Sequence, residues 1–154
     1  MTKKNKLCID LFDDVKVIGI NTAMPDYQLA WNLNKTLGFN FVKYKNININ
    51  DDIDDDMASP NDLCSLYLYD MGENANIYNL VALKSYEGKY WVALKPKLDY
   101  IFVVKNNIKD KDLNMILNKI KSISKVLHAY IIDLDINNKL DVVLERIDFQ
   151  DSNR

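Results

Sequence analysis

The sequence predicts an α+β fold: a single antiparallel sheet of about six or seven strands, with two main helices packed on one face. Closely spaced runs of β-branched and aromatic residues between residues 63 and 105, separated by turn-like segments, predict the sheet. Apolar residues at helical spacing over 26–37 and 110–123 predict the helices. With 154 residues, of which 48% are hydrophobic and 27% charged, the chain has the size and composition of one globular domain over residues 1–154.

The first part of the chain is predicted to form a strand, a helix and a second strand. Residues 15–20 alternate in the manner of a strand. Pro25 and Asp26 then mark the start of a helix, and Gly38 stands where a glycine commonly follows the last helical turn. Residues 39–50 end in an alternation of isoleucine and asparagine, which predicts a strand with one buried face.

Residues 51–61 break this periodicity. Five of their first six residues are aspartates, so the segment is predicted to be a solvated, mobile loop of like charges. Counted from Asp52, an EF-hand would need glycine where Met57 stands and glutamate where Leu63 stands, so the EF-hand pattern is not met. Weak cation binding stays open as an alternative.

The second part of the chain is predicted to contain a meander of strands, a helix, a further strand and a short helix. The expected strands are 64–69, 77–86, 90–94, 100–105 and 126–135. The longer helix begins at Asp110, whose side chain can cap it. The short helix follows from the spacing of Leu140, Val143, Leu144 and Ile147. The chain ends, residues 1–6 and 149–154, are expected to be mobile.

Nothing in the sequence directs the chain into a membrane or out of the cell. The basic start is not followed by the apolar segment of a signal peptide, and no apolar run approaches the roughly 18 residues of a membrane span. We therefore expect a cytoplasmic protein in which Cys8 and Cys64 are free thiols and small core residues. The net charge of −2 provides no general attraction to nucleic acid.

The residue combinations of common enzymes are missing, and no catalytic, cofactor-binding or metal-binding residue is assigned. The four glycines stand apart, each at an expected turn or cap, so there is no phosphate-binding loop. His128 is the single histidine, which excludes sites built from several histidines. A minor hypothesis is an enzyme that uses His128 with Asp133 or Asp135. Its alternative is a structural or surface histidine next to a solvated strand end.

Tyrosines are the most distinctive feature of the predicted sheet. Tyr67 and Tyr69 share one strand face by their spacing, as do Tyr78 and Tyr86 on the next strand. If these faces point away from the helices, they form an amphipathic surface suited to a protein partner or a second copy of the chain. The alternatives are that both sheet faces are covered, that the tyrosines coat a solvated face, or that they stack RNA bases without an RRM-type motif.

Two segments, DYQLAWNLNKTLG at 26–38 and VALKPKLDY at 92–100, resemble the IPExxxVDY family of small Bacteroidota proteins. The likeness covers about residues 5–145, and within the family motif Asp99 and Tyr100 are identical while Leu94 replaces the glutamate. The resemblance implies a cytosolic protein without an assigned activity, whose gene lies near those for ribonuclease III and pyruvate kinase.

The replacement at Leu94 bears on the role of this motif. Leucine can neither exchange a proton nor bind a cation, so either this chain has lost an activity or the motif is structural. We prefer the structural interpretation, with Asp99 bonding local N–H groups at a turn and Tyr100 beginning a strand.

Taken together, these patterns favour a non-enzymatic protein-interaction or self-associating module of the cytoplasm. Its tyrosine face or its acidic loop would meet a protein partner or a second copy, forming a homodimer. An RNA-associated accessory protein is the alternative, based on lysines scattered among aromatic residues and on the gene position that the resemblance implies. A small-ligand-binding or enzymatic domain is the third hypothesis.

Overall fold

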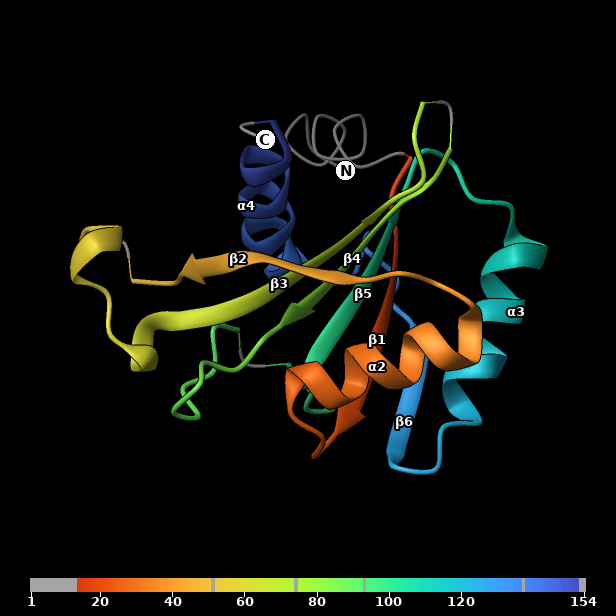
Figure 1. The fold of residues 1–154 in the computed structure, drawn as a ribbon, viewed down its shortest axis with the longest axis horizontal. Helices are drawn as coiled ribbons and strands as arrows, with labels where there is room; N and C mark the ends of the chain where they lie inside the picture. The colour runs from red at the N-terminus through yellow and green to blue at the C-terminus, as the bar shows by residue number, and fades with distance from the viewer. Residues whose placement is uncertain (1–13, 51, 74, 93, 137, 153–154) are drawn as a thin grey trace.

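The computed structural model describes residues 14–152 except 51, 74, 93 and 137. Its strands form one antiparallel sheet in the order β2-β3-β4-β5-β1-β6 (Figure 1). The strands are β1 (Lys16–Thr22), β2 (Val42–Asn48), β3 (Leu63–Asp70), β4 (Ile77–Ala82), β5 (Tyr100–Lys105) and β6 (Val126–Ile131). The helices are α2 (Asp26–Leu37), α3 (Asp110–Lys121) and α4 (Asp141–Ser152). The predicted α+β class with a single antiparallel sheet is confirmed.

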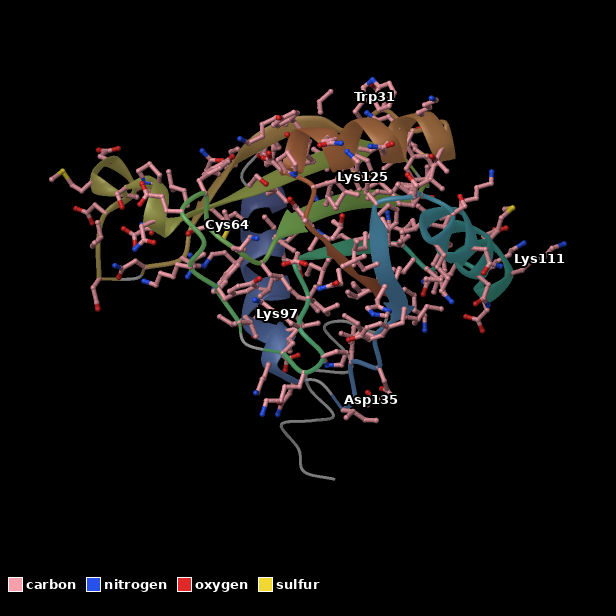
Figure 2. All side chains as sticks on the ribbon, turned by 90° about the horizontal axis from the view of Figure 1, so that it is seen from below. Trp31, Cys64, Lys97, Lys111, Lys125 and Asp135 are labelled. Carbon is pink, nitrogen blue, oxygen red and sulfur yellow. The ribbon has the colours of Figure 1, made fainter. Side chains whose placement is uncertain are left out.

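Helices cover both faces of the sheet (Figures 1 and 2). One face, which we call the α2/α3 face, packs against buried side chains of these two helices, among them Leu29, Leu33, Leu113 and Ile120. The opposite face, the α4 face, packs against Val143, Leu144 and Ile147. The prediction of two main helices on one face is correct, and the short predicted helix is the one that covers the other face.

Helix α2 forms where the local signals predict it. Asp26 lies in its first turn and Lys35 in its last, which suits the helix dipole. Gly38 ends it with a φ of 71°, and its N–H donates to the carbonyl of Asn34 at 2.9 Å. None of the helices in the described part of the chain has the length and apolar composition needed to cross a membrane.

Residues 83–91 form a loop where the sequence predicted strand. Strand β4 ends at Ala82 rather than at residue 86, and the described residues among 90–94 form no strand, with Tyr90 making only an isolated antiparallel bridge to Lys84. The N–H of Trp91 donates to the carbonyl of Leu83 at 2.7 Å, so the loop is closed by its own backbone. The predicted extension of the strand to residue 86 and the predicted strand at 90–94 are therefore wrong.

Gly19 lies inside β1, not at the turn or cap that was predicted for it. A Cβ atom at this position would lie 2.6 Å from Cδ1 of Leu98 and 3.0 Å from Cδ1 of Ile132. Close packing on the α4 face therefore explains the glycine, because any side chain would collide with these buried neighbours.

Cys64 is a core residue, as predicted. It lies on β3 with no exposed surface, and burial raises the pKa of its thiol to about 12. A thiol held protonated in this way is unreactive, because the thiolate is the nucleophile. Cys8 lies outside the described residues.

The acidic segment 51–61 contains local structure that the sequence did not predict. Two short 3₁₀ helices, Asp55–Met57 and Pro60–Asp62, lie within or at the end of it. The amide of Asn48 donates to the carbonyl of Ile53 at 2.7 Å, which folds the segment back on the end of β2. At the predicted mobile ends, α4 continues to Ser152, while residues 1–6 lie outside the described part.

Candidate functional site

Three of the four tyrosines predicted to form an exposed surface lie under the helices. Tyr67 and Tyr78 are 8% and 5% exposed in the core of the α2/α3 face, and Tyr69 packs against the same core. The ring of Phe39 contacts Tyr69 and Tyr78, with centroids 4.9 Å and 4.5 Å away. The condition for an exposed tyrosine surface is therefore not met by these three residues, because their side of the sheet is the one that α2 and α3 cover, which is the alternative in which both faces are covered.

Tyr86 is the exposed member of the set, but its hydroxyl is engaged within the chain. It donates to Oδ1 of Asn46 at 2.8 Å, lies 3.4 Å from Oδ2 of Asp26, and accepts from Nζ of Lys43. Partial burial of its hydroxyl raises the pKa of Tyr86 to about 12, and the nearby negative charge of the Asp26 carboxylate adds to this rise. Tyr86 thus ties the loop after β4 to β2 and to the start of α2.

Asp99 holds two distant segments together instead of bonding local N–H groups. One carboxylate oxygen accepts from the backbone N–H of Thr22 and from the amide of Asn21, both at 3.0 Å. The other accepts from the hydroxyl of Tyr90 at 2.9 Å and lies 4.0 Å from Nζ of Lys84. The buried carboxylate therefore joins the end of β1 to the loop before β5.

Tyr100 begins β5, as predicted. Its hydroxyl donates to the carbonyl of Met24 at 2.7 Å, in the connection between β1 and α2. Burial raises its pKa above the ordinary tyrosine value. Asp99 and Tyr100 thus both make contacts within the fold, as the structural interpretation of this segment predicts.

The structure does not assemble the predicted acid–base pair around His128. His128 is exposed on β6, which ends at Ile131 and not at residue 135. Asp133 and Asp135 lie in the turn that follows, where the carboxylate of Asp133 accepts from the N–H of Asp135 at 3.0 Å. Among the described residues, no hydrogen bond or ion pair joins His128 to either aspartate.

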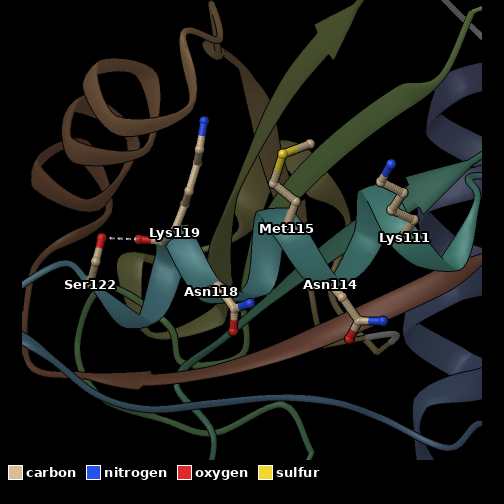
Figure 3. Close-up of a pocket in the computed structure, with 6 residues that line it drawn as sticks. All are labelled: Lys111, Asn114, Met115, Asn118, Lys119 and Ser122. Atoms are coloured by element: carbon tan, nitrogen blue, oxygen red, sulfur yellow. Dashed lines mark hydrogen bonds between the residues drawn. The ribbon is translucent and has the colours of Figure 1, made fainter.

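Two surface hollows lie away from this region and are shallow. One, of about 490 Å³, lies on the outer side of α3 and is lined by Lys111, Asn114, Met115, Asn118, Lys119 and Ser122 (Figure 3). The other, of about 400 Å³, lies beside the acidic segment, where Arg146 donates to the carbonyl of Asn48 at 2.6 Å. Within the described ranges, no group of three or more His, Cys, Asp or Glu side chains is placed to hold a metal ion.

The two edges of the sheet differ in character. Strand β2, at one edge, carries Lys43 and Lys45, and lysines on an edge strand hinder pairing with another chain. Strand β6, at the other edge, has the sequence VLHAYI without Asp, Glu, Lys or Arg. Its Leu127 and Ile131 are 68% and 38% exposed. Strand β6 therefore lacks the charges that protect β2.

Within the described part of the chain, backbone groups on the outer side of β6 have no hydrogen-bond partner. The N–H of Ile132 donates to the carbonyl of Val17 at 2.9 Å, so the backbone polar groups of Ile132 face β1. In an antiparallel pair the residues that face the partner strand alternate, so the N–H and C=O of Tyr130 also face β1. Those of Ala129 and Ile131 point away from the sheet, where an added strand can bond to them.

A groove of about 540 Å³ lies against this edge. The register between β1 and β6 shifts between Asn21 and Thr22, which leaves Leu127 opposite no residue of β1. This bulge displaces Leu127 from the regular ladder and accounts for its exposure. The groove is lined by Pro96, Lys121, Val126, Leu127, His128, Ala129 and Tyr130.

The sequence contains a signal for this edge that does not by itself identify it. Residues 126–131 form an apolar, uncharged run, but residues 100–105, YIFVVK, are nearly as apolar and form the central strand β5. Composition alone does not separate an edge strand of this kind from a central one. The strand order supplies the distinction.

No family model matches the sequence, and a search of curated proteins found no match. The feature of the structure that bears most directly on function is therefore the sheet edge at β6.

Proposed function

We propose that this protein is a non-enzymatic interaction module of the cytoplasm that binds an extended protein segment along β6. The observation that carries the proposal is the uncharged edge strand with exposed apolar side chains. An extended segment can add to an open sheet edge as a further strand, with main-chain hydrogen bonds providing affinity and side-chain contacts providing specificity.

Apolar burial adds to the main-chain bonds in this mode of binding. Leu127 and Ile131 are exposed on β6, and Ile136, which is 76% exposed, lies in the turn just beyond. Fully burying a side chain of this size contributes about 1.5–3 kcal/mol. A strand that covers only part of this surface would gain a fraction of that value for each residue.

The RNA-binding and enzymatic hypotheses have less support than strand addition at β6. RNA stacking on the sheet needs exposed tyrosine rings, and Tyr67 and Tyr78 lie under α2 and α3. The enzymatic hypothesis needs a carboxylate beside His128, and the turn at Asp133 directs that carboxylate to backbone. The open edge favours a protein partner.

Site-specific photo-crosslinking in cells tests the proposal. A photoreactive phenylalanine analogue replaces Leu127 in the full chain, and the matched control places it at Val42 on the other edge, which is 54% exposed. We expect a covalent protein adduct from position 127 and none from position 42, because Lys43 and Lys45 follow the control position on β2 and hinder strand addition there.

A second substitution confirms that the adduct depends on strand addition. Ile131→Lys places a charge at the contact, and we expect the adduct from position 127 to fall about tenfold, because a charge there must lose water when a strand is added. Loss of the adduct in this variant supports the proposal. The absence of any adduct at 127, or equal adducts at both edges, contradicts it.

A further inference from the structure

We infer that the extended segment added at β6 is acidic, and that its Asp or Glu side chains pair with Lys121 and Lys125 beside the start of the strand. This inference rests on the proposed function, because it names the chemistry of the segment that the same edge binds. The observation behind it is the charge around the groove at β6. That charge is positive, whereas the chain as a whole carries −2.

Two lysines border the groove at the start of β6. Lys121 lies in the last turn of α3 and lines the groove. Lys125 immediately precedes Val126, the first residue of β6, and Figure 2 shows it at this end of the strand. Both lysines are exposed, and neither forms an ion pair with another described residue. Their charges are therefore available to a partner.

A third cation comes from the segment before β5. Pro96 lines the groove and Lys97 follows it. The carbonyl of Lys97 accepts from the amide of Asn21, the β1 partner of His128, at 3.1 Å. The ammonium group of Lys97 lies 4.5 Å from the centroid of the Tyr90 ring. A cation held in this way keeps its charge and adds to the positive potential on this side of the molecule.

The groove contains no carboxylate that would neutralise these cations. None of the residues that line it is an aspartate or a glutamate. Asp99, three residues after Pro96, is buried, and its oxygens accept hydrogen bonds from residues within the fold. Asp133 and Asp135 lie in the turn beyond the other end of β6. An acidic segment is therefore attracted to the start of β6, and a basic one is repelled there.

The backbone of the edge favours a polypeptide over another polyanion. Ala129 and Ile131 each direct an N–H donor and a C=O acceptor outward. An extended peptide supplies the matching sequence of donors and acceptors, as in any antiparallel ladder. The phosphates of RNA or of a lipid surface would meet the lysines but provide acceptors only. The edge and the lysines together thus favour an acidic peptide segment.

Charge reversal in the cross-linking experiment tests this inference. The photoreactive analogue stays at position 127, and Lys121→Glu and Lys125→Glu are introduced together into the full chain. We expect the adduct to fall about tenfold, because two attractions to the acidic segment become repulsions. The pair Lys121→Arg and Lys125→Arg keeps both charges and should retain the adduct. The Thr22 hydroxyl bonds to the backbone of Lys125, so this contact survives both changes.

Lys109→Glu with Lys111→Glu is the matched control. Both residues are exposed at the start of α3, whereas Lys121 lies in its last turn, and the pair makes the same change in net charge. We expect the control to leave the adduct unchanged, and circular dichroism of the purified variants shows that they are folded. An adduct that the reversal at 121 and 125 does not weaken, or that the control weakens equally, overturns the inference.

The sequence of the cross-linked peptide provides a second readout. Mass spectrometry of the adduct identifies the peptide attached at position 127. We expect an Asp or Glu within about four residues of the attachment point, since a strand advances about 3.3 Å per residue. A peptide without an acidic residue there, such as VLHAYI from β6 of a second copy, overturns the inference. An adduct that nuclease shortens does the same.

The proposed function can stand when this inference fails. An adduct from position 127 that does not depend on Lys121 and Lys125 supports strand addition and excludes an acidic segment as the occupant. An adduct that depends on both lysines and contains an acidic peptide supports both. The absence of any adduct from the chain with its lysines intact contradicts the proposed function and the inference together.

Discussion

At the scale of single residues, the sheet is held together by a few positions whose chemistry is fixed by close neighbours. Gly19 leaves room for Leu98 on the α4 face, and Asp99 accepts hydrogen bonds from two segments that are distant in sequence. Such residues contribute more to the stability of the fold than their size suggests. Each has either tightly packed neighbours or hydrogen-bond partners that cannot bond to water instead.

Gly19→Ala is expected to lower the free energy of unfolding by about 1–3 kcal/mol, because the added methyl group collides with buried Leu98 and Ile132. Urea unfolding followed by circular dichroism measures the change. In a Leu98→Ala background the same substitution should cost less, since the two closest contacts, both with Leu98, are removed. An equal cost in both backgrounds would show that overpacking against Leu98 is not the cause.

Ionisation of Tyr67 should couple folding to alkaline pH. Burial, followed by the nearby carboxylate of Asp26, raises its pKa from 10.0 to about 12. The folded state thus holds this proton more tightly than the unfolded state. The resulting stabilisation is fully present below pH 10 and is lost as the pH rises toward 12.

Tyr67→Phe tests this coupling, because it removes the ionisable group and keeps the ring. We expect the variant to lose less stability than the wild type between pH 10 and pH 12, measured by urea unfolding at each pH. Tyr27→Phe, at a position 69% exposed, is the control and should follow the wild type. Parallel curves for all three proteins would contradict the assignment.

At the scale of elements, the connections between strands are organised by polar side chains. The loop after β4 is fixed at one end by Tyr86 and at the other by Asp99, which reaches the last residues of β1. The acidic segment is likewise folded back by Asn48. Segments without regular strand pairing thus gain their position from a small number of polar side chains, of which Asp99 and Asn48 are buried and Tyr86 is exposed.

Asp99→Ala should cost about 2–3 kcal/mol, because it leaves the buried N–H of Thr22 and the hydroxyl of Tyr90 without their acceptor. Asp99→Asn keeps the shape and one carbonyl oxygen, so we expect a loss of about 1 kcal/mol. Chemical denaturation of both variants measures the difference. Equal losses would show that the acceptor oxygen at Thr22 is not the stabilising feature.

At the scale of the whole molecule, helices α2, α3 and α4 cover the two faces of the sheet, and within the described residues its edges are open. The α2/α3 face and the α4 face each bury a continuous apolar core. Of the two edges, β2 is protected by lysines and β6 is not. The interaction surface that we propose is therefore a consequence of strand order, since a central strand of the same sequence would have no free backbone groups.

Much of this architecture could be predicted from local signals. Helix α2 follows from Pro25, an apolar stripe and Gly38, and helix α3 from an equally regular stripe. Strands β1, β3 and β5 follow from short apolar runs bounded by turns. Each of these signals lies within the element that it predicts, so no tertiary information was needed.

The candidate site could not be predicted in the same way. Spacing placed Tyr67 and Tyr69 on one strand face, but which face the helices cover depends on how α2 and α3 cross the sheet. The role of Asp99 depends on Thr22, 77 positions earlier in the chain. Contacts at that separation are set by packing and leave no local pattern.

The sequence by itself determined the class of fold, the two main helices and most of the strands, because hydrophobic periodicity and capping residues act over a few positions. The tertiary structure alone decided that the tyrosines are buried and that β6 lies at an unprotected edge. The physical reason is that burial and edge position belong to the relation between elements, and strands of similarly apolar composition, such as β5 and β6, can occupy the centre or the margin of a sheet.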